Sequence, residues 1–313
     1  MELRRVLGDF VLAESWFEDL RGIMKSLHIM RRMEAERAML IAESETERRL
    51  GIALKSDESI ERNEHKSGAR DAACWIIFTD IFADGYQKKQ FEQISADILS
   101  CVEHDTVHIG RKEFIESIIE YFSTGLVKGF LCDCDMKERA FYSKERVKVL
   151  KNVLSKFIRD NGIGSDSDTV EICCGDGAAT IALHELGISP IAADINKCEI
   201  CRGLREGVLD PRRSVVLNCA HLSHFFPNAF DCLFGFMLGK ITPFNLFEWE
   251  PVIRDIPNAL KNNSYIFLSF SSEWEAEKVK SMLRNFNCET FKNENSDGYF
   301  DHWILTGVLS THP

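Results

Sequence analysis

The chain has 313 residues, of which 45% are hydrophobic and 28% charged, so it can build a core and is neither disordered nor collagen-like. Its 38 Lys and Arg against 49 Asp and Glu give a net charge of −11, which disfavours nucleic acids and anionic membranes as partners. The longest apolar stretch, residues 229–238, is too short to span a bilayer, and the charged first 22 residues do not resemble a secretory signal. We expect a cytoplasmic protein whose 11 cysteines are reduced thiols.

Residues 1–140 are predicted to form an all-α N-terminal domain, because helix formers dominate the segment 3–131. A polar interval at 55–70 predicts an exposed loop, and helical patterns resume at 72–82 and 91–104. One apolar stripe spans about two heptads, which is too short to argue a coiled coil. It indicates a helix packed on a core, with a homodimer interface as the alternative; its members are Trp16, Leu20, Ile23, Leu27 and Met30.

Residues 141–313 are predicted to form a second domain of the α/β class. Ser143 is a candidate N-cap for a helix that ends near Gly162, and a polar linker follows. Short apolar runs then alternate with helix-length segments, a pattern that predicts βαβ units and a mostly parallel sheet. We expect strands at 169–173, 191–194, 215–217, 232–236 and 265–270, helices at 178–186, 197–206 and 249–260, and a final hairpin formed by 289–292 and 302–308.

The segment 170–180 carries the clearest functional signal. Glu171 lies at the end of a predicted strand, and Gly175 and Gly177 form a Gly-x-Gly turn before a helix. Ligands of open α/β sheets bind at such strand ends. Asp194 ends the next predicted strand, where its carboxylate is placed to accept hydrogen bonds from ribose hydroxyls. The combination predicts a site for a cofactor that contains a nucleoside.

Two classes of cofactor use this layout. A dinucleotide site prefers a small third residue in the glycine turn and a helix N-terminus that receives the pyrophosphate. Here Thr180 takes the third position, and Glu171 would direct a negative charge toward the phosphates. A cofactor with an amino-acid end and no phosphate suits the residues better, while a nicotinamide-dependent oxidoreductase rests only on the glycines and the distant acid.

The run Glu-Ile-Cys-Cys-Gly-Asp-Gly at 171–177 resembles motif I of the class I S-adenosylmethionine-dependent methyltransferases. Asp194 is similar to that family's ribose-binding acid, and residues 217–220 and 227–233 are similar to its third and fourth motifs. The resemblance covers about residues 140–310. It implies a Rossmann-like, seven-stranded sheet with a C-terminal antiparallel hairpin, and S-adenosyl-L-methionine as the cofactor. The cofactor-binding residues that it implies are Tyr142, Glu171, Cys173, Gly175, Gly177, Asp194, Ile195, Asn218, Cys219, Ala220 and Phe236.

The sequence departs from the family pattern at three places. Cys219 stands where the family has an adenine-binding Asp, so that contact falls to Asn218 or to the backbone of Cys219 and Ala220. Cys173 replaces the first glycine of the motif. Residues 235–240 read Gly-Phe-Met-Leu-Gly-Lys instead of an Asn-Pro-Pro-Tyr motif, which disfavours amino groups of nucleobases and glutamine amides as acceptors. We therefore predict a small molecule or a protein side chain as the methyl acceptor.

The sequence singles out no catalytic base, because methyl transfer mainly requires that acceptor and methyl group are held in line. Five residues are candidate acceptor-side groups, but a solvated-loop or packing role is the favoured interpretation of each: His221, His224, Lys240, Glu248 and Trp249. We expect the N-terminal domain to cap the acceptor pocket, to form a dimer, or both. The alternative is a catalytically silent protein of the same fold that binds a partner through its helical domain.

Three groups of cysteines and histidines are candidate metal ligands. Cys132 with Cys134, and Cys198 with Cys201, lack the loop context of a zinc ribbon. Cys101, His104 and His108 would share a helix face but need a fourth ligand. We assign no metal site.

Overall fold

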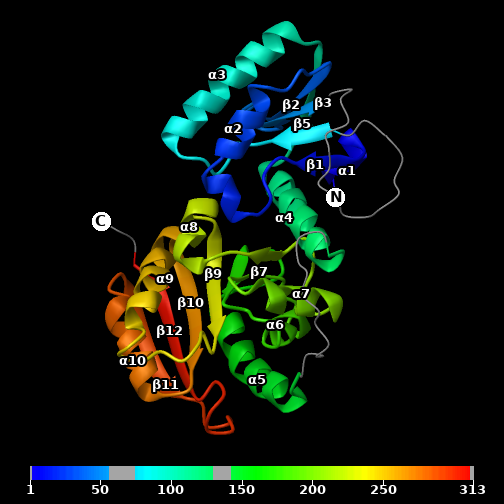
Figure 1. Cartoon of the computed structure of the whole chain (residues 1–313). Coiled ribbons are helices and arrows are strands. Elements are labelled where there is room, and N and C mark those ends of the chain that lie inside the picture. Colours follow the sequence, from blue (N-terminus) through cyan, green and yellow to red (C-terminus); the bar gives the residue numbers. More distant parts are fainter. Residues whose placement is uncertain (1, 56–74, 130–141, 311–313) are drawn as a thin grey trace. The chain divides into compact units, whose positions relative to one another are not determined.

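The computed structural model describes residues 2–55, 75–129 and 142–310, and it divides the chain into two compact units. The N-terminal unit is Met1–Asp133 and the C-terminal unit is Cys134–Pro313 (Figure 1). The predicted domain boundary between residues 140 and 141 lies outside the described residues. Among the residues that the structure describes, no helix is both long and apolar enough to cross a membrane.

The C-terminal unit alternates strands and helices as the sequence predicts. Helix α5 (Lys144–Asp160) opens the unit, and the Ser143 hydroxyl accepts a hydrogen bond from the Arg146 N–H, as an N-cap does. The predicted strands and helices are all present, with ends shifted by a few residues; α10 and the short elements η2 and α8 were not predicted. The elements after α5 are β6 (Thr169–Ile172), α6 (Thr180–Glu185), β7 (Ile191–Asp194), α7 (Lys197–Arg205), β8 (Ser214–Val216), η2 (Cys219–His221), α8 (Leu222–Phe225), β9 (Phe230–Phe236), α9 (Leu246–Ala259), β10 (Leu260–Phe270), α10 (Glu273–Met282), β11 (Phe286–Lys292) and β12 (Trp303–Leu309).

The seven strands form one sheet in the order β11-β12-β10-β9-β6-β7-β8. Neighbours from β10 to β8 are parallel, whereas β12 is antiparallel to both β10 and β11. The sequence-based expectation of a mostly parallel, seven-stranded sheet that ends in an antiparallel hairpin is therefore confirmed.

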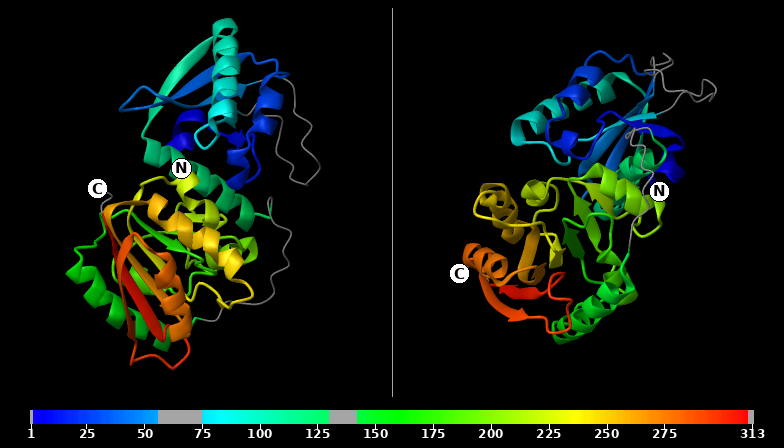
Figure 2. Two further views of the ribbon diagram at one scale, coloured as in Figure 1. Left: turned by 90° about the vertical axis from the view of Figure 1, so that its left-hand side faces the viewer. Right: turned by 60° about the horizontal axis from the view of Figure 1, so that its bottom comes forward.

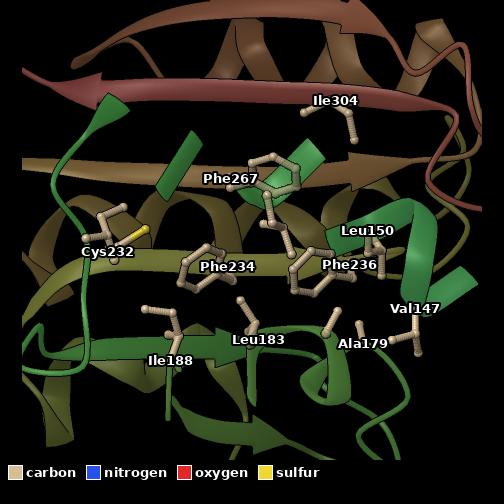
Figure 3. Packing of buried hydrophobic residues seen from close by; sticks show 13 residues of the cluster. Val147, Leu150, Ala179, Leu183, Ile188, Cys232, Phe234, Phe236, Phe267 and Ile304 are labelled. Atoms are coloured by element: carbon tan, nitrogen blue, oxygen red, sulfur yellow. The ribbon is translucent and has the colours of Figure 1, made fainter. Parts of the chain in front are cut away.

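Helices cover both faces of this sheet. Leu150 and Leu154 of α5 and Leu183 of α6 pack against Phe234 and Phe267 on one face (Figure 3). Figure 1 shows α9 and α10 on the opposite face, and the views in Figure 2 show the same layering. Both faces of the parallel strands are thus removed from water, and every residue of β6 and β7 is buried, including the polar Thr169 and Glu171 of β6.

The N-terminal unit is not all-α, so that prediction is wrong: the unit contains a five-stranded sheet in the order β1-β4-β3-β2-β5. The described elements are α1 (Glu2–Leu7), β1 (Phe10–Leu12), η1 (Glu18–Arg21), α2 (Met24–Met30), β2 (Arg37–Glu43), β3 (Arg49–Lys55), β4 (Trp75–Phe78), α3 (Gly85–Cys101), β5 (His104–Ile109) and α4 (Arg111–Val127). The loop expected at 55–70 lies, beyond Lys55, outside the described residues.

The error has a physical cause. Strands β2 (Arg-Ala-Met-Leu-Ile-Ala-Glu) and β3 (Arg-Leu-Gly-Ile-Ala-Leu-Lys) are composed largely of good helix formers, and their pairing with each other and with β4 and β5 overrides that weak local preference. The expected helix at 72–82 is in part strand β4, while 91–101 is helical. The apolar stripe 16–30 does not form one helix, because only Leu20 lies in η1 and only Leu27 and Met30 lie in α2. Leu20, Ile23, Leu27 and Met30 are buried in the core as expected.

Four strands of this sheet run in one direction, because β1 is parallel to β4, β2 is parallel to β5, and only β3 is antiparallel to its neighbours. Helices α2 and α3 pack on one face through Leu27 and Phe91. The carboxyl ends of β1, β4, β2 and β5 therefore lie along one edge of the sheet, and α3 and α4 begin at that edge, after β4 and β5.

Candidate functional site

The candidate site lies at the carboxyl ends of the parallel strands in the C-terminal unit. From β6 the chain order proceeds through β7 to β8 on one side, while β9 and β10 lie on the other. The order thus reverses between β6 and β9. Ligands of open α/β sheets bind in the crevice at such a reversal.

The turn that follows β6 has an unusual backbone. Cys173, Gly175 and Gly177 have φ angles of 54°, 57° and 88°, which lie in the left-handed region that favours glycine. A Cβ atom at Gly177 would approach Leu209 Cδ2 to 2.7 Å, and one at Gly175 would approach Glu199 Oε2 to 2.8 Å. Both glycines therefore allow the turn to pack against α7 and the segment behind it. Cys173 carries a side chain where the φ angle would suit a third glycine.

Asp194, at the end of β7, links this turn to the neighbouring strand. Its Oδ2 accepts a hydrogen bond of 2.8 Å from the Gly175 N–H, and its Oδ1 accepts one of 2.7 Å from the Asn196 N–H. The carboxylate is 9% exposed. A carboxylate can accept about four hydrogen bonds, so acceptor capacity remains for a further donor at this position.

Glu171 lies under the turn and is 1% exposed. Its Oε2 accepts a hydrogen bond of 2.7 Å from the Thr180 hydroxyl. Burial raises the pKa of this carboxyl to about 8, against the lowering effects of the Thr180 hydrogen bond and the Arg146 charge. At pH 7 the carboxyl is therefore mainly in its neutral form, and a cation beside it would favour the charged form.

Tyr142 and Ile195 flank the turn and the Asp194 carboxylate. The Tyr142 hydroxyl donates a hydrogen bond of 3.2 Å to the main-chain oxygen of Asp176. Burial, with the charges of Asp176 and Glu206 as further causes, raises the pKa of Tyr142 to about 12. Ile195 directly follows Asp194 and is 67% exposed, which leaves an apolar surface next to the acid.

The residues after β8 form the third part of the predicted set. Asn218 is the N-cap of η2, and its Oδ1 accepts a hydrogen bond of 3.0 Å from the Ala220 N–H. The Cys219 thiol is buried and directed inward, 3.9 Å from the main-chain oxygens of Ala193 and Leu217. A side-chain acceptor for adenine is therefore absent at Cys219.

The Cys219 thiol also meets Cys173 from the glycine turn. A hydrogen bond between the two thiols, together with burial, raises the pKa of Cys173 well above its usual value. The first and third predicted segments thus come together beneath the surface. Phe236, at the end of β9, is 5% exposed and packs in the core next to Phe234 and Phe267 (Figure 3).

A buried ion pair near the site was not anticipated from the sequence. Arg146 donates to Asp301 through Nε at 2.7 Å and through Nη2 at 3.3 Å, and Asp301 is 0% exposed. The Ser269 hydroxyl, at the end of β10, donates to the same carboxylate. The sequence places Arg146 in the first turn of a helix capped by Ser143, which is the only feature that could have drawn attention to it. No local pattern links it to Asp301, because the two residues are 155 positions apart.

Acidic side chains dominate this edge. Besides Glu171 and Asp194, the turn carries Asp176, whose Oδ2 accepts a hydrogen bond of 3.0 Å from Arg202 Nε. Glu199 lies beside Gly175, and burial and the Asp194 charge raise its pKa. This environment repels phosphates and favours a ligand that offers hydroxyl donors and positive charge.

The polar groups expected on the acceptor side occupy varied positions. His221 ends η2, and His224 in α8 packs edge-on against Phe225 at 5.1 Å. Lys240 and Glu248 are exposed, and the Trp249 ring lies against Gly239. The structure does not direct these five residues toward one point, so it adds no catalytic base to those that the sequence left open.

The structure does not bring the candidate metal ligands together in one site among the described residues. His104 and His108 lie on β5 and not on a helix, and Cys101 ends α3. Within the described ranges, no group of three or more His, Cys, Asp or Glu side chains is arranged to hold a metal ion. Cys132 and Cys134 lie outside the described residues.

No protein-family model matches the chain, and no curated protein matches it in sequence. Solved structures do match in fold. A putative S-adenosylmethionine-dependent methyltransferase from Methanococcus maripaludis is 15% identical, with 62% of this chain and 94% of that chain covered and a TM-score of 0.42. Magnesium protoporphyrin IX methyltransferase from Synechocystis is 14% identical, with 64% and 98% covered and a TM-score of 0.41. A Burkholderia thailandensis 1,6-didemethyltoxoflavin-N1-methyltransferase is 14% identical, with 66% and 93% covered and a TM-score of 0.40.

The assignment of the fold rests on the chain's own sheet and not on these scores. The strand order, the single antiparallel strand β12 and the glycine turn after β6 agree with the resemblance found in the sequence.

Proposed function

We propose that the C-terminal unit binds S-adenosyl-L-methionine at the carboxyl edge of its sheet and transfers the methyl group to a small molecule or a protein side chain. The observation that carries this proposal is the hydrogen bond of 2.8 Å from the Gly175 N–H to Asp194 Oδ2. It joins the glycine turn to the acid of the next strand at the point where the strand order reverses.

In the proposed complex each part of the site contacts a different part of the cofactor. Asp194 accepts hydrogen bonds from the ribose hydroxyls, and the exposed Ile195 side chain packs against the adenine ring. The backbone around Cys219 and Ala220 faces the adenine edge. Glu171, supported by Thr180, stabilises the positive charges at the methionine end.

The acidic character of the edge separates the two cofactor classes. Asp176, Glu199 and the ionised form of Glu171 would oppose the pyrophosphate of a dinucleotide, whereas they favour a cationic ligand without phosphate. Bound S-adenosylmethionine would supply a methyl group on a sulfonium: an electron pair of the acceptor would bond to the methyl carbon, the electrons of the broken sulfur–carbon bond would return to sulfur, and any proton on the acceptor atom would be released to solvent. The chain's task is to orient the two and to exclude water.

Exposed aromatic side chains indicate where the acceptor binds. Phe244 is 91% and Phe247 69% exposed, and both follow β9. Trp274 follows β10, and Tyr299 and Phe300 precede the antiparallel β12, so all five belong to segments at the same edge of the sheet. Large apolar groups exposed in one region are typical of a binding surface. They favour an acceptor with an apolar or aromatic part.

A titration tests the proposal. At 100 times its dissociation constant a ligand adds about 2.7 kcal/mol of stability, so thermal unfolding is followed with S-adenosylmethionine, S-adenosylhomocysteine and NADH in parallel. We expect both sulfur nucleosides and not NADH to stabilise the protein, and Asp194→Ala to abolish the effect. Asp166→Ala, a change of an exposed acid in the same unit, is the matched control. Stabilisation by NADH alone, or by none of the three, would contradict the proposal.

The inward direction of the Cys219 thiol favours a second candidate function. A protein of this fold without an adenine-binding acid can serve as a catalytically silent binding module. Such a module would bind its partner equally well with Asp194 or Ala at position 194, and it would transfer no labelled methyl group from S-adenosylmethionine to any acceptor. Transfer that depends on Asp194 excludes this candidate.

A further inference from the structure

A cavity of about 200 Å³ lies at the carboxyl edge of the sheet in the N-terminal unit. Four cationic side chains line it together with two acids: Arg48, Arg49, Lys88 and Arg111, with Asp80 and Glu92. The cavity is smaller than the roughly 300–1,000 Å³ that is usual for a whole drug-sized ligand. Its size fits a single charged group.

The lining residues come from segments that the fold brings to one edge. Arg48 and Arg49 lie where the β2–β3 turn enters β3, and Asp80 follows the end of β4. Lys88 lies in the first turn of α3, and Arg111 is the first residue of α4, directly after β5. Arg111 thus lies at the N-terminus of α4, where the Gly110 N–H donates a hydrogen bond to the Glu113 carboxylate.

Arg49 packs against an aromatic ring, and its acidic neighbours do not accept hydrogen bonds from its guanidinium group. Its guanidinium lies 5.0 Å from the centre of the Phe91 ring, which fixes its position. Its Nη2 is 3.6 Å from Asp80 Oδ2 and 3.7 Å from Glu92 Oε1, which are ion-pair and not hydrogen-bond distances. Among the described residues, the buried Nε of Arg49 has no hydrogen-bond acceptor. A buried donor of this kind calls for an acceptor.

The charges in the lining do not balance. Four cations against two acids leave two positive charges, in a chain whose net charge is −11. Burial lowers the pKa of the Arg111 guanidinium, as does the neighbouring Arg48 charge, and Glu43 outside the cavity acts in the opposite direction. Burial also raises the pKa of Asp80, and the neighbouring Arg49 charge acts in the opposite direction. The lining therefore carries an excess of positive charge.

We propose that this cavity binds a phosphate group. A phosphate monoester carries a charge of about −1.5 to −2 at neutral pH and offers three acceptor oxygens, which matches the excess of positive charge and the forked donors of the arginines. A singly charged carboxylate would neutralise only one of the two excess positive charges. The group comes either from free phosphate or from a phosphorylated small molecule, and both sources share this chemistry.

The test is a calorimetric titration of the full chain with inorganic phosphate, phenyl phosphate and acetate, at constant ionic strength maintained with chloride. We expect saturable binding of inorganic or phenyl phosphate and at least tenfold weaker binding of acetate. Tighter binding of phenyl phosphate than of phosphate would assign the site to a phosphorylated small molecule, and the reverse would assign it to the free ion.

Variants separate the cavity from the general charge of the protein. Arg48 is exposed and Lys88 half-buried, so Arg48→Gln and Lys88→Gln should fold, and each is expected to weaken phosphate binding about tenfold. Arg32→Gln removes an exposed charge of the same unit outside the cavity and should leave the affinity unchanged. Absence of saturable phosphate binding by the unmodified chain would overturn the proposal. So would an equal loss of affinity in Arg32→Gln and the two cavity variants.

Discussion

Both units contain a sheet in which all strands but one run in the same direction, yet the edges at which these strands end carry opposite charges. In the C-terminal unit that edge holds Glu171, Asp176, Asp194 and Glu199 around a turn of left-handed backbone. In the N-terminal unit it holds the cationic cavity formed by residues 48, 49, 88 and 111. The comparison teaches that the direction of the strands decides where a ligand can bind, while a few side chains at the edge decide its charge.

The two edges also differ in what builds them. The acidic edge depends on backbone geometry, because Gly175 and Gly177 adopt φ angles of 57° and 88° and pack closely against residues near α7. The basic edge depends on side chains contributed by four separate segments. Changes to the backbone should therefore damage the first edge, and changes of charge should tune the second.

The largest effect is expected from Gly177→Ala. Its Cβ would meet Leu209 Cδ2 at 2.7 Å and Val208 Cγ1 at 2.9 Å, in a residue with a φ angle of 88°. The combined strain and overpacking should destabilise the C-terminal unit by about 2–5 kcal/mol, as measured by denaturant unfolding. Gly187→Ala has a similar φ angle of 78° but no atom within 4 Å of the new Cβ, so it should cost only about 1–2 kcal/mol. Equal losses in both variants would show that close packing at Gly177 is unimportant.

A pH series addresses the buried acid of the same edge. Because the pKa of Glu171 is about 8 in the folded chain and 4.5 for the free side chain, folding keeps a proton that the unfolded chain releases. The stability that this group contributes is fully present below pH 4.5 and is lost as the pH rises to about 8. Glu171→Gln should remove about 2–4 kcal/mol of that decline. Identical pH profiles of the two proteins between pH 5 and 8 would refute the assignment.

Removing a single acidic charge from the cavity lining should change the affinity of the N-terminal unit for phosphate. Glu92→Gln removes an exposed acid 3.7 Å from Arg49 and should strengthen phosphate binding by up to about fivefold, since exposed ion pairs are worth up to about 1 kcal/mol. Calorimetry with inorganic phosphate measures the change, and Glu103→Gln, an exposed acid outside the cavity, is the control. Weaker binding in Glu92→Gln would mean that this carboxylate orders Arg49 rather than competing for it.

The smallest effect is expected from Cys173→Gly. The φ angle of 54° strains a cysteine, but the flexible glycine loses more entropy on folding, and the two effects nearly cancel. The free energy of unfolding should change by less than about 1 kcal/mol. If the variant unfolds much more easily, the hydrogen bond between the thiols of Cys173 and Cys219 contributes more than the backbone does.

The C-terminal unit could be predicted from its sequence because its signals are local. Ser143 caps α5, the buried strands are short apolar runs, and the glycine turn follows directly on β6. The contacts among Arg146, Asp301 and Ser269 could not be predicted, since they join segments that are far apart in the chain. The inward direction of the Cys219 thiol was likewise invisible, because a sequence does not say on which side of a loop a side chain lies.

The sequence by itself determined the C-terminal fold class, the order of its elements and the position of the candidate cofactor site, because residues 170–194 encode strand, turn, helix and strand in one continuous segment. Only the tertiary structure decided that the N-terminal unit is built on a sheet. Strands β2 and β3 consist of residues that also favour helices, and pairing with β4 and β5 determines their conformation. It also decided that Arg48, Lys88 and Arg111 meet in one cavity, because parallel strands bring their carboxyl ends to the same edge.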